Sequence, residues 1–267
     1  MKKRFPLSSE FVYQLFSLFI SVILLHAIYA AVIRPKADAF LAGEAALMKD
    51  DPAHVTRSSI LVIISDYEQE ACFILMVWAL SIMGYKAVST HKHRRLLESD
   101  LVPLAEGVRI LPEDTKDLSR QIQGLPPDQR RALLSRVLLA ALQRFSSTHN
   151  IQDVSDVAHS YCSAEGERLD AELSMVRYIA WAIPSIGFIG TVRGIGLALG
   201  QAHKAVQGDI FDVTKSLGIA FNSTLIALLI SIVLMFVLHQ LQLMQERYVL
   251  DCEAYCEEKL TCRLHKR

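Results

Sequence analysis

The sequence predicts an all-α polytopic membrane protein with four transmembrane helices and helical cytoplasmic extensions. Of the 267 residues, 52% are hydrophobic and only 21% are charged, which is too apolar for a soluble domain of this length. The apolar residues gather in four long runs, and no convincing strand pattern accompanies them. Basic and acidic residues balance at 28 each, so the net charge of zero gives no basis for nucleic-acid binding through a basic surface.

The first span is predicted at residues 11–33, after a cytoplasmic N-terminus at residues 1–10. It contains no Asp, Glu, Lys or Arg and one histidine, His26, and its 23 residues are long enough to cross ~30 Å of hydrocarbon. The basic residues Lys2 to Arg4 and the apolar run also fit a cleaved signal peptide, but the run exceeds the ~7–15 apolar residues of a signal-peptide core. We therefore expect an uncleaved anchor.

The second span is predicted at residues 71–88 and is the shortest apolar run. Ala71 to Tyr85 is apolar, and Lys86 can extend its ammonium group toward the membrane surface, so the helix can continue to Val88. An outer loop at residues 34–70 joins the first two spans.

The third and fourth spans are predicted at residues 178–199 and 216–241, joined by an outer loop at residues 200–215. The third is apolar apart from Arg193 and contains Pro184, which membrane helices tolerate because neighbouring helices satisfy the freed backbone groups. The fourth contains no Asp, Glu, Lys or Arg.

The distribution of cations predicts that both termini and the long middle section lie in the cytoplasm. Lys and Arg residues next to the spans concentrate on one side of the membrane, which the positive-inside rule assigns to the cytoplasm. The cations on that side are Lys2, Lys3, Arg4, Lys86, Lys92, Arg94, Arg95, Arg168, Arg177 and Arg247. On the other side, residues 34–70 carry four basic residues against seven acidic ones, and residues 200–215 carry two lysines.

The cytoplasmic section, residues 89–177, is predicted to be helical. Residues 126–128, Pro-Pro-Asp, mark a helix start, and apolar residues then recur at helical spacing up to about Ser147. A second stripe begins at Ile151 and runs into the third span, so we expect that membrane helix to extend into the cytoplasm. Residues 242–267 are expected to form a cytoplasmic C-terminal helix.

No motif for catalysis, cofactor binding or metal binding stands out. The sequence lacks a Gly-rich phosphate loop, His-Glu-x-x-His and Gly-x-Ser-x-Gly, so we expect no enzyme activity, no catalytic residue and no cofactor. Three cysteines and a histidine between Cys252 and His265 have a spacing unlike the usual ligand signatures, so we expect no metal site. A proton relay through His26 or His239 stays open.

Two of the spans carry a continuous stripe of small residues. On the third span, positions 184, 187, 191, 194 and 198 share one face and are Pro, Gly, Thr, Gly and Ala. On the fourth, the corresponding face carries Ala220, Thr224, Ala227 and Ser231. Small faces let helices approach closely, and plain helix packing is one explanation for them. We expect the stripes to face each other, leaving the bulky residues for lipid and for the first two spans.

The two stripes lie in a pair of motifs that resembles the MotA/TolQ/ExbB proton-channel family. The segment Pro184-Ser-Ile-Gly187-Phe-Ile-Gly190-Thr191-Val192-Arg193-Gly194-Ile195 is similar to the family's Pro-x-x-Gly-[Leu/Phe]-x-Gly-Thr-Val-x-Gly-Ile. Phe221-Asn222-Ser223-Thr224 resembles the family's following helix with its own threonine. The resemblance covers a channel domain of about residues 165–245.

The resemblance implies a homo-oligomer, expected to be a pentamer, in the bacterial inner membrane around a single-span partner of the ExbD/TolR/MotB type that carries an intramembrane Asp. The flow of protons would drive mechanical work on an envelope partner, with sodium ions as the less favoured alternative. By this resemblance Pro184 is the helix bend. The implied pore-lining residues are Thr191, Thr224, Gly187, Gly190, Gly194, Ala220, Ala227 and Ser231.

Arg193 stands where the family more often has an aromatic residue. We expect it to act in gating or at an interface, and to reach the membrane surface or pair with Asp209 or Asp212 of the outer loop.

Because none of the four predicted spans contains Asp or Glu, we expect the proton-carrying carboxylate to come from the partner. The hydroxyls of Thr191 and Thr224 can hydrogen-bond such a group but cannot replace it. The alternative function is a non-conducting membrane scaffold or sensor subunit whose cytoplasmic helices bind a signalling protein.

Overall fold

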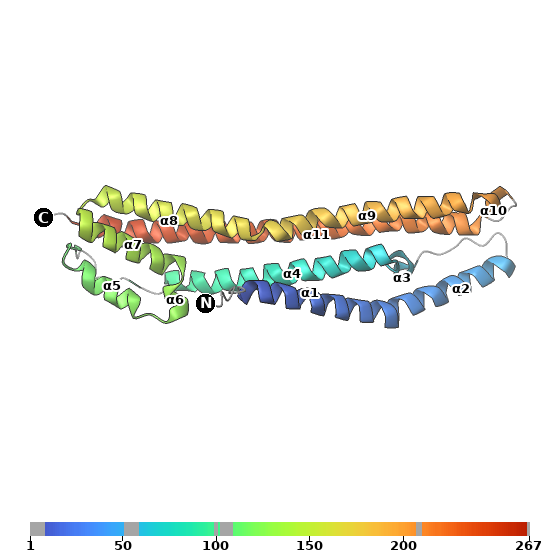
Figure 1. Ribbon diagram of the computed structural model, residues 1–267, viewed down its shortest axis with the longest axis horizontal. Coiled ribbons are helices and arrows are strands. Elements are labelled where there is room, and N and C mark those ends of the chain that lie inside the picture. The colour runs from blue at the N-terminus through green and yellow to red at the C-terminus, as the bar shows by residue number, and fades with distance from the viewer. Residues whose placement is uncertain (1–8, 51–58, 99–100, 102–108, 207–209, 266–267) are drawn as a thin grey trace, which may run out of the picture. The chain divides into compact units, whose positions relative to one another are not determined.

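The chain is helical in the computed structural model, which describes residues 9–50, 59–98, 101, 109–206 and 210–265 (Figure 1). Four helical stretches are long and apolar enough to cross a membrane: Glu10–Glu44, Tyr67–Glu98, Ile151–Gly200 and Phe211–Arg263. Within the described ranges, the β pairing consists of an isolated parallel bridge between Ile110 and Leu264. The predicted class, an all-α protein with four spanning helices, is confirmed.

The chain divides into two compact units. Unit 1 comprises residues 1–83 and 175–238, and unit 2 comprises residues 84–174 and 239–267. The long helices α4 (Tyr67–Arg94) and α11 (Phe211–Lys259) contribute to both. Unit 1 therefore contains the most apolar part of every span, and unit 2 contains the helices predicted between and after the spans.

Unit 1 begins with a long helix of three parts: α1 (Ser9–Ile28), a π-helical turn (Tyr29–Ile33) and α2 (Arg34–Asp50). Leu, Ile and Phe occur all round α1, as expected for a helix surrounded by lipid. Small polar groups join it to α4, where Ser17 Oγ donates a hydrogen bond to Ser81 Oγ at 2.7 Å. The segment predicted as a loop after the first span is therefore helical in its first half.

The second spanning helix begins earlier than the sequence suggested. A short helix, α3 (Ile60–Ile63), precedes α4, which starts at Tyr67 rather than at residue 71. The first turn of α4 contains Glu68 and Glu70, which its positive N-terminal end favours. The helix that contains the second predicted span therefore starts with two acidic residues, which precede the acid-free residues 71–88.

The remaining helices of unit 1 are α9 (Ser174–Gly200), α10 (Ala202–Val206) and the first part of α11. Pro184 lies inside α9, which continues on both sides of it. Bulky residues on the outer faces of α9 and α11 are exposed, such as Phe188 and Phe221 at 65% each. These faces have the character expected for contact with lipid or with other membrane helices.

Unit 2 contains four further helices: α5 (Thr115–Gln123), α6 (Pro127–Arg130), α7 (Leu133–Thr148) and α8 (Ile151–Glu172). The helix predicted to start at residues 126–128 is only the single turn α6, and the apolar helix proper begins at Leu133. α7 and α8 form a hairpin joined by two residues. His149 adopts the left-handed conformation with φ 52° and ends α7, and Asn150 caps α8 by accepting a hydrogen bond from the Gln152 amide.

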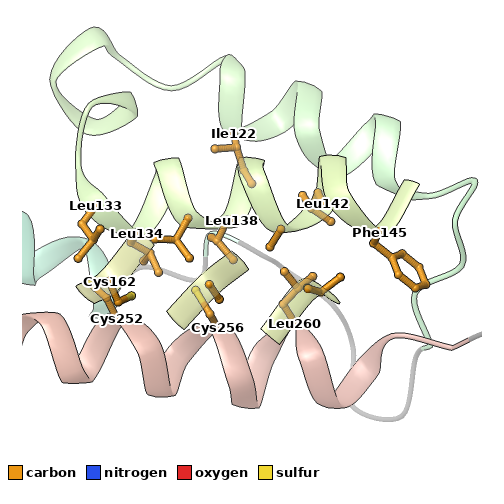
Figure 2. Close-up of a cluster of buried hydrophobic side chains, with 14 of the residues drawn as sticks. Ile122, Leu133, Leu134, Leu138, Leu142, Phe145, Cys162, Cys252, Cys256 and Leu260 are labelled. Atoms are coloured by element: carbon orange, nitrogen blue, oxygen red, sulfur yellow. The ribbon is translucent and has the colours of Figure 1, made fainter. Parts of the chain in front are cut away.

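The core of unit 2 joins α7, α8 and the C-terminal part of α11 (Figure 2). The large buried side chains include Leu133, Leu134, Leu138, Leu142, Phe145, Cys162, Cys252, Cys256 and Leu260. Burial raises the pKa of the Cys162 thiol to about 11 and that of Cys252 to about 12, so both stay protonated at neutral pH. These cysteines act as small apolar core residues.

Candidate functional site

Glycines bring α9 and α11 into close contact within one chain. A Cβ placed on each of three glycines would meet the other helix too closely for any L side chain: Gly187 against Ala227 Cβ at 2.4 Å, Gly190 against Ser223 Cβ at 2.6 Å and Gly194 against Ala220 Cβ at 2.7 Å. Only glycine therefore permits this separation, as in other small-residue membrane helix pairs. The two small-residue stripes face each other as the sequence predicted.

Five of the residues predicted to line a pore lie in this contact within one chain. Gly187, Gly190 and Gly194 are buried, and Ala220 and Ala227 are 0% exposed. In the single chain they hold α9 against α11. The pore-lining assignment stays a prediction for these five residues, as it does for Thr191, Thr224 and Ser231.

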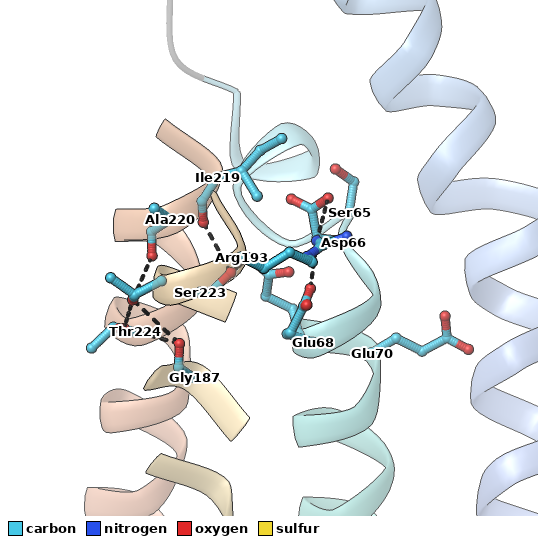
Figure 3. A network of polar contacts seen from close by, with 12 residues as sticks. Ser65, Asp66, Glu68, Glu70, Gly187, Arg193, Ile219, Ala220, Ser223 and Thr224 are labelled. Atoms are coloured by element: carbon cyan, nitrogen blue, oxygen red, sulfur yellow. Dashed lines mark hydrogen bonds and ion pairs between the residues drawn. The ribbon is translucent and has the colours of Figure 1, made fainter. Parts of the chain in front are cut away.

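Thr191 and Thr224 meet at the centre of the contact. Their Oγ1 atoms lie within hydrogen-bond distance of each other. Thr191 Oγ1 also lies 3.0 Å from the Ala220 carbonyl oxygen. Thr224 Oγ1 lies 3.1 Å from the Gly187 carbonyl oxygen (Figure 3). A hydroxyl has one proton to donate and two lone pairs, so each threonine keeps some capacity to accept. Both side chains are half-buried, so this pair remains open to a water molecule or a partner group.

Ser231 compensates for the proline in α9. Because Pro184 lacks an N–H, the carbonyl of Ala180, four residues earlier, loses its helical partner. Ser231 Oγ of α11 donates to that carbonyl oxygen at 3.0 Å. The fourth small-stripe residue of α11 thus has a structural role, which lets Pro184 sit inside a spanning helix without an unsatisfied carbonyl.

Arg193 makes its ion pairs with the start of α4 rather than with the loop predicted. Its Nη2 lies 2.7 Å from Glu68 Oε2 and 3.8 Å from Asp66 Oδ1 (Figure 3). The predicted pairing with Asp212 is wrong, because Asp212 pairs with Lys204 at 2.6 Å. Asp209, the other predicted partner, lies outside the described residues.

The two carboxylates around Arg193 occupy a partly buried position. The side chains of Asp66 and Glu68 are only 20% and 12% exposed, against 39% for Arg193. Burial raises the pKa of Asp66, and the nearby Arg193 guanidinium acts in the opposite direction. This cluster therefore joins α4 to α9 at the same end of unit 1 as the threonine pair.

A second ion cluster connects the first helix to α4. Glu70, with a side chain only 7% exposed, accepts from His26 Nδ1 at 2.7 Å and also pairs with Arg34. The Arg34 guanidinium lies 4.1 Å from the centroid of the Tyr67 ring, a cation–π contact. Glu70 therefore connects residues on either side of the π-helical turn.

The π-helical turn explains how His26 and Arg34 reach one carboxylate. Eight residues of regular α-helix would place them about 80° apart around the axis. A π-helical turn absorbs one extra residue, which lowers the difference to about 20°. Sequence reasoning singled out His26 but missed Glu70, because an acid just before an apolar run resembles the end of a loop.

The other predicted candidates lie apart from these clusters. His239 is an exposed residue of α11. Among the described residues, no three His, Cys, Asp or Glu side chains gather closely enough to hold a metal ion. Cys252 lies in the core of unit 2, Cys262 is exposed, and the His265 ring lies 3.2 Å from Arg109 Nη1.

Comparison with known proteins gives one family similarity. Searches of curated proteins and of solved structures gave no match. Residues 129–254 match the sequence model of the MotA/TolQ/ExbB proton channel family. This range is wider than the 165–245 predicted and adds α7 and the start of α8, while it still contains Thr191 and Thr224. The chain is therefore a multi-pass membrane protein whose residues 129–254 are similar to the MotA/TolQ/ExbB proton channel family.

Proposed function

We propose that this chain is the channel-forming subunit of a complex in the bacterial inner membrane that couples proton flow to mechanical work on an envelope partner. The observation that carries the proposal is the Thr191–Thr224 pair, two half-buried hydroxyls in contact on neighbouring spanning helices of the family domain. In this proposal the hydroxyls hydrogen-bond water or a carboxylate that takes up and releases the proton.

That carboxylate comes from a partner. The two acidic residues in the first turn of α4 already neutralise cations of the chain: Glu68 pairs with Arg193, and Glu70 pairs with Arg34. A hydroxyl does not change charge at physiological pH, so the threonines cannot replace a proton carrier. A single-span subunit with an intramembrane Asp, held in a ring of about five copies of this chain, supplies the missing group.

The orientation with both termini in the cytoplasm belongs to the same proposal. Lys92 and Arg94 occupy the last turn of α4, at the end that the positive-inside rule assigns to the cytoplasm. Cysteines introduced at residues 46 and 120 should then react with an impermeant thiol reagent from opposite sides of the membrane. Labelling of both from the same side would overturn the four-span orientation.

The threonine variants test the proposed mechanism. Thr191→Val and Thr224→Val preserve side-chain shape and remove one hydroxyl each, so proton flux in vesicles that contain the chain and its single-span partner should fall to the background leak. Thr214→Val is the matched control, because Thr214 is an exposed α11 residue whose hydroxyl donates only to backbone carbonyls of the preceding turn.

Assembly of each variant with the partner is measured in parallel. Lost flux with normal assembly supports the proposal. Wild-type flux in both Thr191→Val and Thr224→Val would remove the hydroxyls from the mechanism, and a wild-type complex with no flux at all would favour the non-conducting scaffold.

A further inference from the structure

Unit 2 has a groove between α8 and α11 that its own chain leaves open. The groove has a volume of about 470 Å³. Its floor is apolar, with Leu169, Leu173, Val249 and Leu250, and its polar lining includes the acids Glu167, Asp170 and Glu246. No Lys or Arg lines it. A ligand for this groove therefore combines an apolar side chain with positive charge.

Gln245 provides an independent sign that the groove is incomplete. Its side chain lines the groove and is 4% exposed, yet its Nε2 atom has no hydrogen-bond partner among the described residues. An unsatisfied buried donor is costly, so this part of the groove is incomplete within one chain.

The face of α4 that points away from the groove carries the complementary chemistry. Lys86 pairs with Glu172 at 2.7 Å and Arg94 pairs with Asp251 at 3.1 Å, which identifies the side of α4 that packs on its own unit. At about 100° per residue, the opposite side displays Val88 and Lys92, and Arg95 follows in the 3-10 turn Arg95–Glu98. Lys92 already forms an exposed ion pair with Asp128 of α6 at 3.0 Å. Val88 is 71% exposed, and both cations are exposed.

The groove lies on the other side of the unit. On α11, Tyr248 and Asp251 face α4, since the Tyr248 ring stacks near His93 and Asp251 pairs with Arg94. At about 100° per residue, Glu246 points about 170° away from the mean direction of those two residues. The acidic groove and the basic face of α4 thus lie on opposite sides and cannot meet within one chain.

The acidic groove and the basic face of α4 also lie at the same level along the helix axes. The pairs Lys86–Glu172 and Arg94–Asp251 place residues 86–94 of α4 beside the stretches of α8 and α11 that line the groove. Copies of a protein in one membrane are related by rotation about the membrane normal, which preserves height. A head-to-tail contact between different surfaces closes into a ring when the rotation between neighbouring copies is a whole fraction of a full turn.

We infer that the acidic groove of one copy receives the α4 face of the next copy, with Val88 on the apolar floor and Arg95 against the acidic rim. This assignment rests on the proposed ring-forming function and names the surfaces of unit 2 that build the ring. Opposite charges on the two surfaces favour this register, and like charges at the same position disfavour it.

Disulfide cross-linking of the full-length chain in native membranes tests the contact. In a Cys262→Ser background, which removes the exposed native thiol, Val88→Cys is combined with Leu250→Cys. Oxidation should produce a ladder of covalent oligomers that ends at the ring size, because each copy links to the next. Each single variant is the matched control and should give no ladder beyond a dimer.

Charge reversal tests the same contact without a disulfide. Glu246→Lys and Arg95→Glu should each lower the fraction of ring, measured by native mass spectrometry in mild detergent, about tenfold. The double variant should recover most of the fraction of ring, because the two opposite charges exchange places and still attract each other. Lys116→Glu, an exposed change on α5, should leave the ring unaffected.

The outcomes separate this contact from the proposed function. A wild-type ring that gives no ladder and tolerates both reversals rejects the contact and leaves the channel proposal standing. A ladder together with wild-type flux in Thr191→Val and Thr224→Val supports the contact and rejects the proposed mechanism. A wild-type chain that stays monomeric rejects both.

Discussion

At the scale of single residues, the ion clusters show how this chain keeps charges in its spanning helices. Arg193 lies in the middle of a family motif, on a helix that is otherwise apolar apart from its start. Its guanidinium is held by Glu68 and Asp66 from the start of α4. A cation in a membrane protein needs such partners, and the carboxylates in turn need the cation.

The variant Arg193→Leu should therefore destabilise the chain by about 2 kcal/mol, because it leaves two partly buried carboxylates without a cation. Glu68→Leu should also destabilise it, and the double variant should cost less than the sum of the two single changes. Lys204→Leu is the matched control, since its pair with Asp212 is more exposed and should contribute less than about 1 kcal/mol. Unfolding in detergent measures all four, and strict additivity would show that Arg193 and Glu68 do not interact.

At the scale of elements, the contact between α9 and α11 depends on missing side chains. Gly187, Gly190 and Gly194 let the helices approach until backbone atoms and alanines touch. This proximity brings the hydroxyls of Thr191 and Thr224 together. The glycines thus act on the site indirectly, through the distance between two helices.

Gly187→Ala should destabilise the helix pair by about 1–3 kcal/mol, because the new methyl group would overlap the Ala227 Cβ unless the helices separate. Gly196→Ala, on the same helix, is the matched control: a Cβ there meets nothing within 4 Å, and alanine favours helix. The comparison is made by denaturant unfolding in detergent. Equal stability of the two variants would mean that the close approach is absent in the folded protein.

The pairing of α8 with α11 should depend on pH through His159. The hydrogen bond from His159 Nδ1 to Glu253 Oε1 at 2.7 Å, and then the charge of Glu253, raise the pKa of the histidine in the folded chain. A raised folded-state pKa stabilises the fold fully below the unfolded value of about 6.5, and this contribution disappears as pH rises through the folded-state pKa.

His159→Gln should therefore lower the unfolding midpoint at about pH 6 and have a smaller effect at about pH 8.5. His91→Gln, which removes an exposed histidine with no ion pair in the described part of the chain, is the control. An effect of His159→Gln that is the same at both pH values would exclude the ionised pair.

Much of this organisation was accessible from sequence, and the exceptions have physical reasons. Long apolar runs predict the spans, and helical spacing predicts which small residues share a face. The contact between Thr191 and Thr224 was therefore predictable. Glu68 and Glu70 were missed because an apolar run defines a span only by the absence of charge. Their cationic partners come from distant helices, and no local pattern records that pairing. The burial of the glycines was likewise invisible until the second helix was placed.

At the scale of the whole molecule, the family domain extends over both units. Residues 129–254 include the threonine pair of unit 1 and the core and groove of unit 2. The proposed division of labour gives proton passage to unit 1, together with a partner, and ring contacts to unit 2. Neither task requires a cofactor or a catalytic residue in this account.

Proton flux with and without the partner tests the central claim most directly. The purified chain is placed in proteoliposomes alone, with its single-span partner, or with a partner whose intramembrane Asp is changed to Asn, and acidification is followed under a membrane potential. The account predicts flux above the leak of empty liposomes only with the unmodified partner, and further loss of that flux in Thr191→Val. Equal flux in all three preparations, or none in any of them despite a stable complex, would contradict it.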